Sequence, residues 1–178
     1  MPWVLTSCPY GTKQIKYVMT KKTISFVQPN FQQGPKEFNA YYLPYSAGVV
    51  WSYSLADPAI SERFEATDWI WRRDALEPTA QRLALNSIVT FSTYVWNHRY
   101  NYELARRIKE INPTVLTVFG GPEPAITDPD LFRKEPFMDL VICYEGEITF
   151  KTDFIRIVRI ICISSCEYTI LNSESNWT

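Results

Sequence analysis

The chain has 178 residues, of which 46% are apolar and 21% charged, and its formal net charge at pH 7 is −1. This length suits one domain, and the apolar fraction is sufficient for a hydrophobic core. A nearly neutral chain without a basic stripe argues against a nucleic-acid partner. No uncharged apolar run is long enough to span a bilayer, so we expect no membrane partner. The absence of a secretory signal and of a disulfide framework favours a cytoplasmic location.

The two ends of the chain differ from its middle. Residues 1–22 have no clear periodicity and are predicted to be an N-terminal extension, in which Met19 is a candidate native start. Residues 23–150 alternate between strand and helix patterns and are predicted to form the domain. Residues 151–178 break this alternation and are predicted to be an atypical C-terminal tail.

Five apolar segments rich in β-branched and aromatic residues are predicted to be strands, and Pro, Asn or Asp residues mark helix ends between them. The elements expected in chain order are a strand at Thr23–Gln28, a loop at Pro29–Leu43, a helix from Pro44 to Leu55, a strand at Asp68–Arg72, a helix from Pro78 through Ala84, a strand at Ser87–Ser92, a helix at Asn101–Asn112, a strand at Val115–Phe119, a helix beginning at Asp128–Pro129–Asp130 and a strand at Leu140–Cys143.

The alternation of strands and helices indicates the fold class. Strands joined through helices form right-handed crossovers and a parallel sheet. We therefore expect an α/β, flavodoxin-like (Rossmann-like) doubly wound sheet of five parallel strands, in the order 2-1-3-4-5.

In such a sheet, ligands bind outside the carboxyl ends of the strands. Adjacent glycines there allow either a tight turn or the close approach of a bulky ligand, hydroxyls either bind a polar ligand group or cap a loop, and carboxylates are either solvated or accept hydrogen bonds from a ligand amide. The candidate binding residues at this edge are Pro29, Asn30 and Phe31; Ser92, Thr93 and Tyr94; Gly120, Gly121 and Pro122; and Glu145, Gly146 and Glu147.

Two motifs together are more specific than any of these residues alone. Val118–Ala125 contains Phe-Gly-Gly-Pro, and Phe137–Phe150 contains a Glu-Gly-Glu turn. They resemble the second half of the cobalamin-binding domain found ahead of radical S-adenosylmethionine domains. Ile88–Tyr94 is similar to the third strand of that family, and Leu43–Gly48 to the helix opening after its first strand. Tyr144 stands where that family usually has a glycine.

The resemblance covers Thr23 to Phe150 and implies a bound cobalamin cofactor over the edge of the sheet. Its nucleotide tail would be directed toward strands one, three and four. By position, Ser92, Thr93 and the Gly120–Gly121 pair would line the tail channel. The resemblance also implies that the Pro29–Phe31 loop, Tyr94 and the Glu145–Glu147 turn face the corrin ring.

The chain departs from the resemblance in two respects. The segment Gln28–Gly34 lacks the histidine that ligates cobalt in many cobalamin domains, and His98 is predicted to have a surface or cap role. Radical S-adenosylmethionine chemistry needs three thiolates for a four-iron cluster. Cys162 and Cys166 have part of that spacing, but Thr169 occupies the third position, so no iron–sulfur cluster is expected in this chain. We predict no catalytic residues and no metal ligands.

The sequence thus favours a cobalamin-binding module, as a fragment or a stand-alone version of the N-terminal domain of a cobalamin-dependent radical S-adenosylmethionine enzyme. A separate radical domain is then a candidate partner. An enzyme that binds a nucleotide or sugar-nucleotide is an alternative, which the lack of a glycine-rich loop after strand one disfavours. A receiver-type, non-catalytic interaction domain is another, but Gln28 and Ser92 replace the acidic residues that it needs. A domain left nonfunctional by its tail is a further alternative.

Overall fold

The structure is a computed structural model that describes residues 21–152 except residues 36 and 38–39. The predicted tail cysteines, Cys162 and Cys166, and most of the predicted N-terminal extension lie outside the described residues. The domain boundaries therefore stay predictions.

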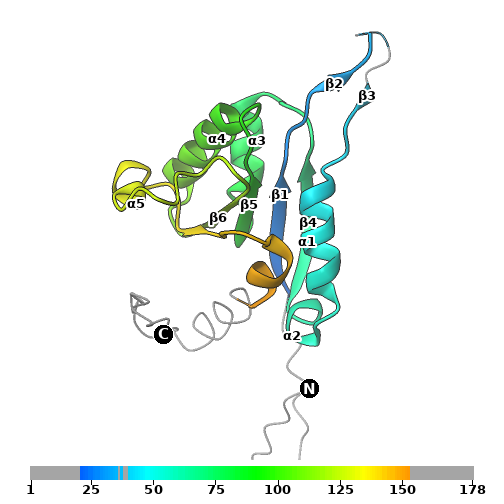
Figure 1. The fold of residues 1–178 in the computed structure, drawn as a ribbon, viewed down its shortest axis with the longest axis vertical. Coiled ribbons are helices and arrows are strands. Elements are labelled where there is room, and N and C mark those ends of the chain that lie inside the picture. The colour runs from blue at the N-terminus through cyan, green and yellow to red at the C-terminus, as the bar shows by residue number, and fades with distance from the viewer. Residues whose placement is uncertain (1–20, 36, 38–39, 153–178) are drawn as a thin grey trace, which may run out of the picture.

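A five-stranded parallel sheet forms the centre of the domain (Figure 1). Its spatial order is β4-β1-β5-β6-β7, and every neighbouring pair is parallel. Numbered along the chain, these strands have the order 2-1-3-4-5, which confirms the predicted fold class and topology. The strands are β1 (Lys22–Val27), β4 (Phe64–Ile70), β5 (Ile88–Ser92), β6 (Leu116–Gly120) and β7 (Leu140–Val141).

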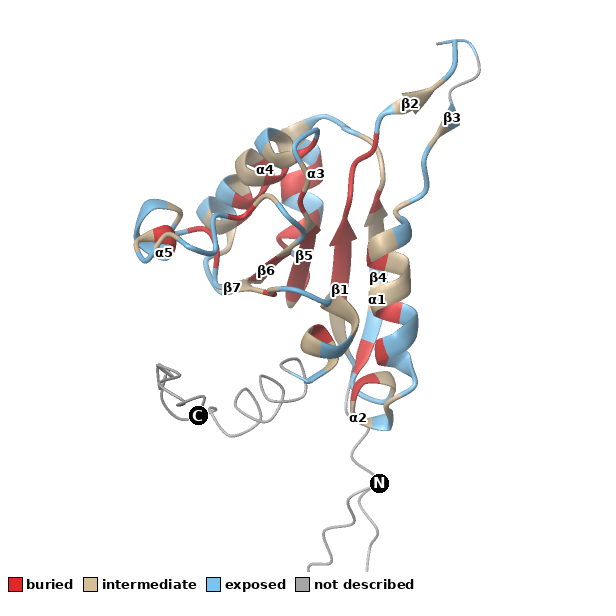
Figure 2. Ribbon diagram, in the orientation of Figure 1, coloured by how far each residue is buried: buried red, intermediate tan, exposed pale blue. Residues whose placement is uncertain are grey.

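Helices cover both faces of the sheet, and the pleat of the strands divides the core between them. Alternate residues of β1 show this division, because Ile24 and Phe26 belong to one buried cluster and Val27 to the other. Figure 2 shows the buried strands between partly exposed helices. The helices are α1 (Tyr45–Leu55), α2 (Pro58–Ser61) and residues 146–152 on one face, α3 (Leu76–Leu83) and α4 (His98–Ile111) on the other, and the short α5 (Leu131–Lys134) between β6 and β7.

The segment predicted to be a loop after the first strand contains a small antiparallel hairpin. Its strands are β2 (Gln32–Gln33) and β3 (Ala40–Tyr41), and it projects beyond the carboxyl ends of the sheet (Figure 1). Two residues per strand are too few to produce a recognisable alternation. The loop prediction was therefore incomplete.

The predicted helix start at Asp128 was wrong, because α5 begins only at Leu131. The side chain of Asp128 accepts a hydrogen bond from the backbone N–H of Asp130 (2.9 Å) and closes a turn that keeps Pro129 outside the helix. An Asp side chain that accepts a hydrogen bond from the backbone N–H two residues later is typical of such turns as well as of helix caps. The sequence signal was thus real, but it marked a turn.

The predicted second strand was displaced along the chain. The strand β4 begins at Phe64 and ends at Ile70, whereas the prediction placed it at Asp68–Arg72. It lies at the edge of the sheet and is only partly buried, so its hydrophobic pattern is weak.

No helix in the part of the chain described by the structure combines the length and the apolar character needed to cross a membrane.

Candidate functional site

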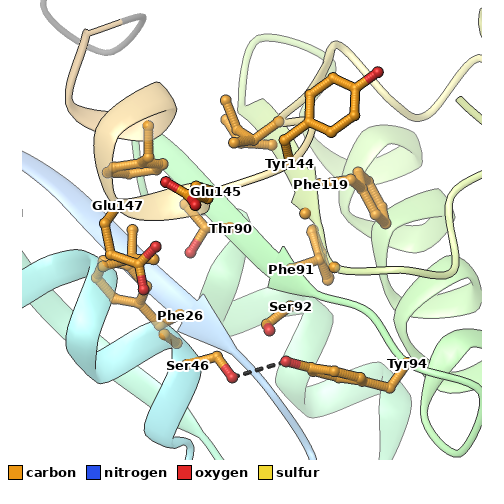
Figure 3. A pocket seen from close by; sticks show the side chains of 18 residues that line it. Phe26, Ser46, Thr90, Phe91, Ser92, Tyr94, Phe119, Tyr144, Glu145 and Glu147 are labelled. Carbon is orange, nitrogen blue, oxygen red and sulfur yellow. Dashed lines mark hydrogen bonds between the residues drawn. The ribbon is translucent and has the colours of Figure 1, made fainter.

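A pocket of about 290 Å³ opens at the carboxyl ends of β1, β5 and β6, between α1 and the helical residues 146–152 (Figure 3). Its residues come from strands and helices that lie far apart in the sequence. They are Phe26, Ser46, Ala47, Val50, Thr90, Phe91, Ser92, Tyr94, Val118, Phe119, Gly120, Gly121, Ile142, Tyr144, Glu145, Gly146, Glu147 and Phe150.

The interior of the pocket is apolar because it continues one of the two cores. Phe26, Val118, Ile142 and Phe150 belong to the cluster that α1 and residues 146–152 cover. Thr90 has the one hydroxyl among the strand residues that line the pocket below its rim. This hydroxyl donates a hydrogen bond to the backbone oxygen of Ser25 in the neighbouring strand β1 (3.1 Å). The interior therefore suits a flat apolar group rather than a charged one.

The rim of the pocket carries polar groups. The hydroxyls of Ser46 and Tyr94 are 2.7 Å apart and connect α1 to the loop after β5 (Figure 3). The ring of Tyr94 stacks on Trp96, with ring centroids 4.6 Å apart and planes 3° from parallel. Glu145 and Glu147 add carboxylates on another side of the rim. A ligand that fills the apolar interior thus meets hydroxyls and carboxylates where it leaves the pocket.

A direct backbone contact forms part of the rim at the end of β6. Gly121 has a φ of 98°, and a Cβ placed on it would lie 2.3 Å from the backbone oxygen of Thr93. The N–H of Thr93 donates to the oxygen of Gly120 (2.7 Å). Only glycine fits at position 121, because both its conformation and its contact exclude a side chain.

A buried amide below the rim ties two loops together. The side chain of Asn97 accepts a hydrogen bond from the N–H of Tyr94 (2.8 Å) and donates to the backbone oxygens of Pro29 (3.2 Å) and Ser92 (3.1 Å). Next to it, Asn101 donates to the Thr93 hydroxyl (3.1 Å), while its own side-chain oxygen has no hydrogen-bond partner among the described residues. The loops after β1 and β5 are thereby held at a fixed distance from each other.

The structure brings seven of the twelve predicted residues to this pocket. They are Ser92, Tyr94, Gly120, Gly121, Glu145, Gly146 and Glu147. The cofactor-binding role of each of these residues stays a prediction.

The other five predicted residues lie outside the lining. Pro29 and Asn30 are buried, and the Asn30 amide donates to the backbone oxygens of Tyr42 and Leu43, which follow β3, each at 3.0 Å. Thr93 is fully buried behind the rim. Phe31 is half exposed and contacts the edges of neighbouring aromatic rings, and Pro122 is exposed.

Sequence reasoning missed the contribution of α1 to the pocket. Ala47 and Val50 line it from one side of this helix, and the N–H of Ala47 is fixed by the side-chain oxygen of Gln28 (3.0 Å). Their spacing of three residues, which places them on one helix face, was a usable signal. Asn97 was also missed, since a single Asn before a helix is common and carries no ligand signal.

The only histidine lies away from the pocket lining. His98 is the first residue of α4, and its Nδ1 is 2.9 Å from the backbone oxygen of Val95 and 3.7 Å from a carboxylate oxygen of Glu123. The ring of His98 is partly exposed and does not cap the helix, because the N-cap residue of α4 is Asn97.

The family model described as B12 binding domain matches residues 63–152, which is half of the chain. The chain belongs to the B12-binding domain family. This membership and the fold identify the chain as a cobalamin-binding module.

Curated relatives of this B12-binding domain include three methyltransferases. The 2-(S-pantetheinyl)-carbapenam-3-carboxylate methyltransferase of Streptantibioticus cattleyicolor is 30% identical over 110 residues, which are 62% of this chain and 16% of that protein. The cobalamin-dependent radical SAM methyltransferase TokK of Streptomyces tokunonensis is 29% identical over the same shares. The uncharacterized methyltransferase PH0819 of Pyrococcus horikoshii is 42% identical over 50 residues, which are 28% of this chain and 11% of that protein. The chain thus spans about a sixth of its first two relatives.

Among solved structures, the CheY-like protein tadZ from Pseudomonas aeruginosa PAO1 is similar to 78% of this chain, over 99% of its own length. The TM-score is 0.47 and the sequence identity 14%.

Proposed function

We propose that this B12-binding domain holds cobalamin with the nucleotide tail in the pocket and the corrin ring over its rim. The observation that carries this proposal is the apolar pocket at the carboxyl edge of the sheet. The corrin macrocycle is far larger than a cavity of about 290 Å³, whereas the flat base at the end of the tail is of a size and polarity that suit it.

Different residues of the pocket would contact different parts of the cofactor. Phe26, Val50 and Phe150 would exclude water from the base. The hydroxyls at the rim, those of Ser92 and the Ser46–Tyr94 pair, would face the polar part of the tail. The glycine at position 121 leaves the backbone bare at the rim, so that a bulky ligand can approach it closely.

Bound cobalt would supply the capacity to carry and transfer a methyl group. The protein's contribution is then to bind, orient and shield the cofactor. No histidine belongs to the pocket lining within the described residues, so we propose that this domain contributes no imidazole ligand from the pocket.

We further propose that a separate radical S-adenosylmethionine domain uses the cofactor held here. Two relatives support this, since both are named as methyltransferases and one of them as a cobalamin-dependent radical SAM enzyme. Each is about six times longer than the region that it shares with this chain. We also propose that the protein is located in the cytoplasm.

The proposal is tested by mixing the full chain with hydroxocobalamin, removing free ligand by desalting and recording the visible spectrum. Retention of about one corrinoid per chain, with a shifted spectrum, is the expected result. A folded chain that retains no corrinoid, and whose fluorescence instead responds to a purine nucleotide, would contradict it and favour the nucleotide-binding alternative.

A further inference from the structure

We infer that Tyr144 is a positioning residue whose ring packs against the part of the corrinoid that projects from the pocket. This inference rests on the proposed function. Its starting point is the backbone, because Tyr144 has a φ of 64° and is the one non-glycine residue with positive φ in the described part of the chain.

The backbone conformation of the turn that contains Tyr144 favours a residue other than tyrosine. It joins β7 to the helical residues 146–152, and its geometry requires a left-handed residue at this position. A Cβ is disfavoured in that region, where glycine fits without penalty and asparagine fits better than most residues. An aromatic residue in this conformation therefore needs a compensating role.

Contacts inside the domain do not supply such a role. The side chain of Tyr144 is 94% exposed, and it forms no hydrogen bond or ring contact with any described residue. A large exposed aromatic side chain held in a disfavoured conformation is the kind of outlier from which a functional role is inferred. Its contact must then be with something outside the described chain.

The position of the ring indicates what it contacts. Tyr144 belongs to the pocket lining, yet Figure 3 shows its ring directed away from the interior, with the hydroxyl outermost. A ligand group inside the pocket is out of its reach, whereas a group that projects over the rim lies beside it. The corrin ring, which is too large to enter, is that group, and its methyl-bearing face is suited to an aromatic ring.

The test compares the full chain with three variants at this position. Tyr144→Phe keeps the ring, Tyr144→Gly removes both the ring and the unfavourable Cβ, and Tyr144→Asn removes the ring but keeps a side chain that tolerates the conformation. Each protein is titrated with hydroxocobalamin and followed by its visible spectrum and its thermal midpoint.

We expect Tyr144→Phe to bind like the parent chain, and Tyr144→Gly and Tyr144→Asn to bind roughly tenfold more weakly. We also expect the midpoint of free Tyr144→Gly to be at least as high as that of the parent, since the unfavourable Cβ is gone. Affinities of Gly and Asn variants within twofold of the parent would overturn the inference, as would a lower midpoint for the free Gly variant. A parent chain that binds no corrinoid would instead refute the proposed function.

Discussion

The shape of the pocket rim depends on two single residues, of which one acts through its bare backbone and the other through its side-chain amide. Gly121 allows the end of β6 to lie against the loop after β5, and Asn97 holds that loop against the segment after β1. Both residues set the distance between the walls of the pocket, so we expect changes at these positions to act on the shape of the site.

Substituting Gly121 with alanine tests the backbone contact. The added Cβ would lie 2.3 Å from the Thr93 oxygen, at a φ of 98°, so the loop must move. We expect Gly121→Ala to lower the free energy of unfolding by about 2–4 kcal/mol, measured by urea denaturation. The neighbouring Gly120→Ala is the matched control, because its Cβ would meet only ordinary contacts at 3.9 Å. We expect that variant to stay within about 1 kcal/mol of the parent. Equal losses for both variants would show that the contact has no special role.

At the scale of elements, α3 and α4 are joined by a chain of charges on their outer surface. Glu103 accepts hydrogen bonds from Arg107 (2.9 Å) and Arg106 (2.8 Å), and Arg107 also donates to Glu77 of α3 (3.0 Å). The hydrogen bond from Arg107, more than any other interaction, holds the pKa of Glu103 below its ordinary value. Folding therefore favours the ionised carboxylate.

This lowered pKa predicts a small pH dependence of stability. The stabilising contribution of Glu103 is complete above its unfolded-state pKa, close to 4.5, and is lost as the pH falls through the lower folded-state pKa. Because the groups are exposed and screened, we expect Glu103→Gln to lower the free energy of unfolding at pH 7 by less than about 1 kcal/mol. The difference from the parent should disappear when thermal unfolding is measured well below pH 4. A loss of the same size in acid would contradict the assignment to charge.

Elements with a strong pattern were predictable, and elements fixed by local contacts were not. The amphipathic segment after Asn97 predicted α4, although the helix begins at His98 and not at Asn101. The apolar segment Ser87–Ser92 correctly predicted the central strand β5, which begins at Ile88, since burial on both faces leaves a continuous apolar run. By contrast, α5 depends on how the Asp128 side chain bonds, and the β2–β3 hairpin has only two residues in each strand, so neither element can be read from periodicity.

For the whole molecule, the topology determines where a site can form, and the packing of distant elements determines its depth. The order 2-1-3-4-5 brings Ser92 and the Gly120–Gly121 pair to one edge, so the edge was predictable from the sequence. The pocket was not, because it exists only where α1 and residues 146–152 meet over the sheet. A Cβ placed on Gly146 would lie 3.3 Å from a side-chain carbon of Val50, so two segments nearly a hundred residues apart are in contact here.

That arrangement predicts that filling the pocket with a side chain prevents binding of the nucleotide tail and leaves binding of the corrin ring intact. Val50 lines the pocket from α1, so Val50→Phe places a ring where the base of the tail would lie. Ser52→Phe is the matched control, because it adds a ring at an exposed position of the same helix. We expect Val50→Phe to reduce the affinity for hydroxocobalamin, in a spectroscopic titration, to that for dicyanocobinamide, a corrinoid without the nucleotide tail. Ser52→Phe should bind both ligands like the parent. Equal affinity losses in the two variants would contradict this prediction.

The most direct measurement is the ratio of the dissociation constants of the full chain for dicyanocobinamide and hydroxocobalamin. If the tail occupies the pocket, burial of its base should make hydroxocobalamin bind at least about tenfold more tightly, which corresponds to roughly 1.4 kcal/mol. Equal dissociation constants would mean that the tail stays in solvent, and the placement of cobalamin in this pocket would then be wrong.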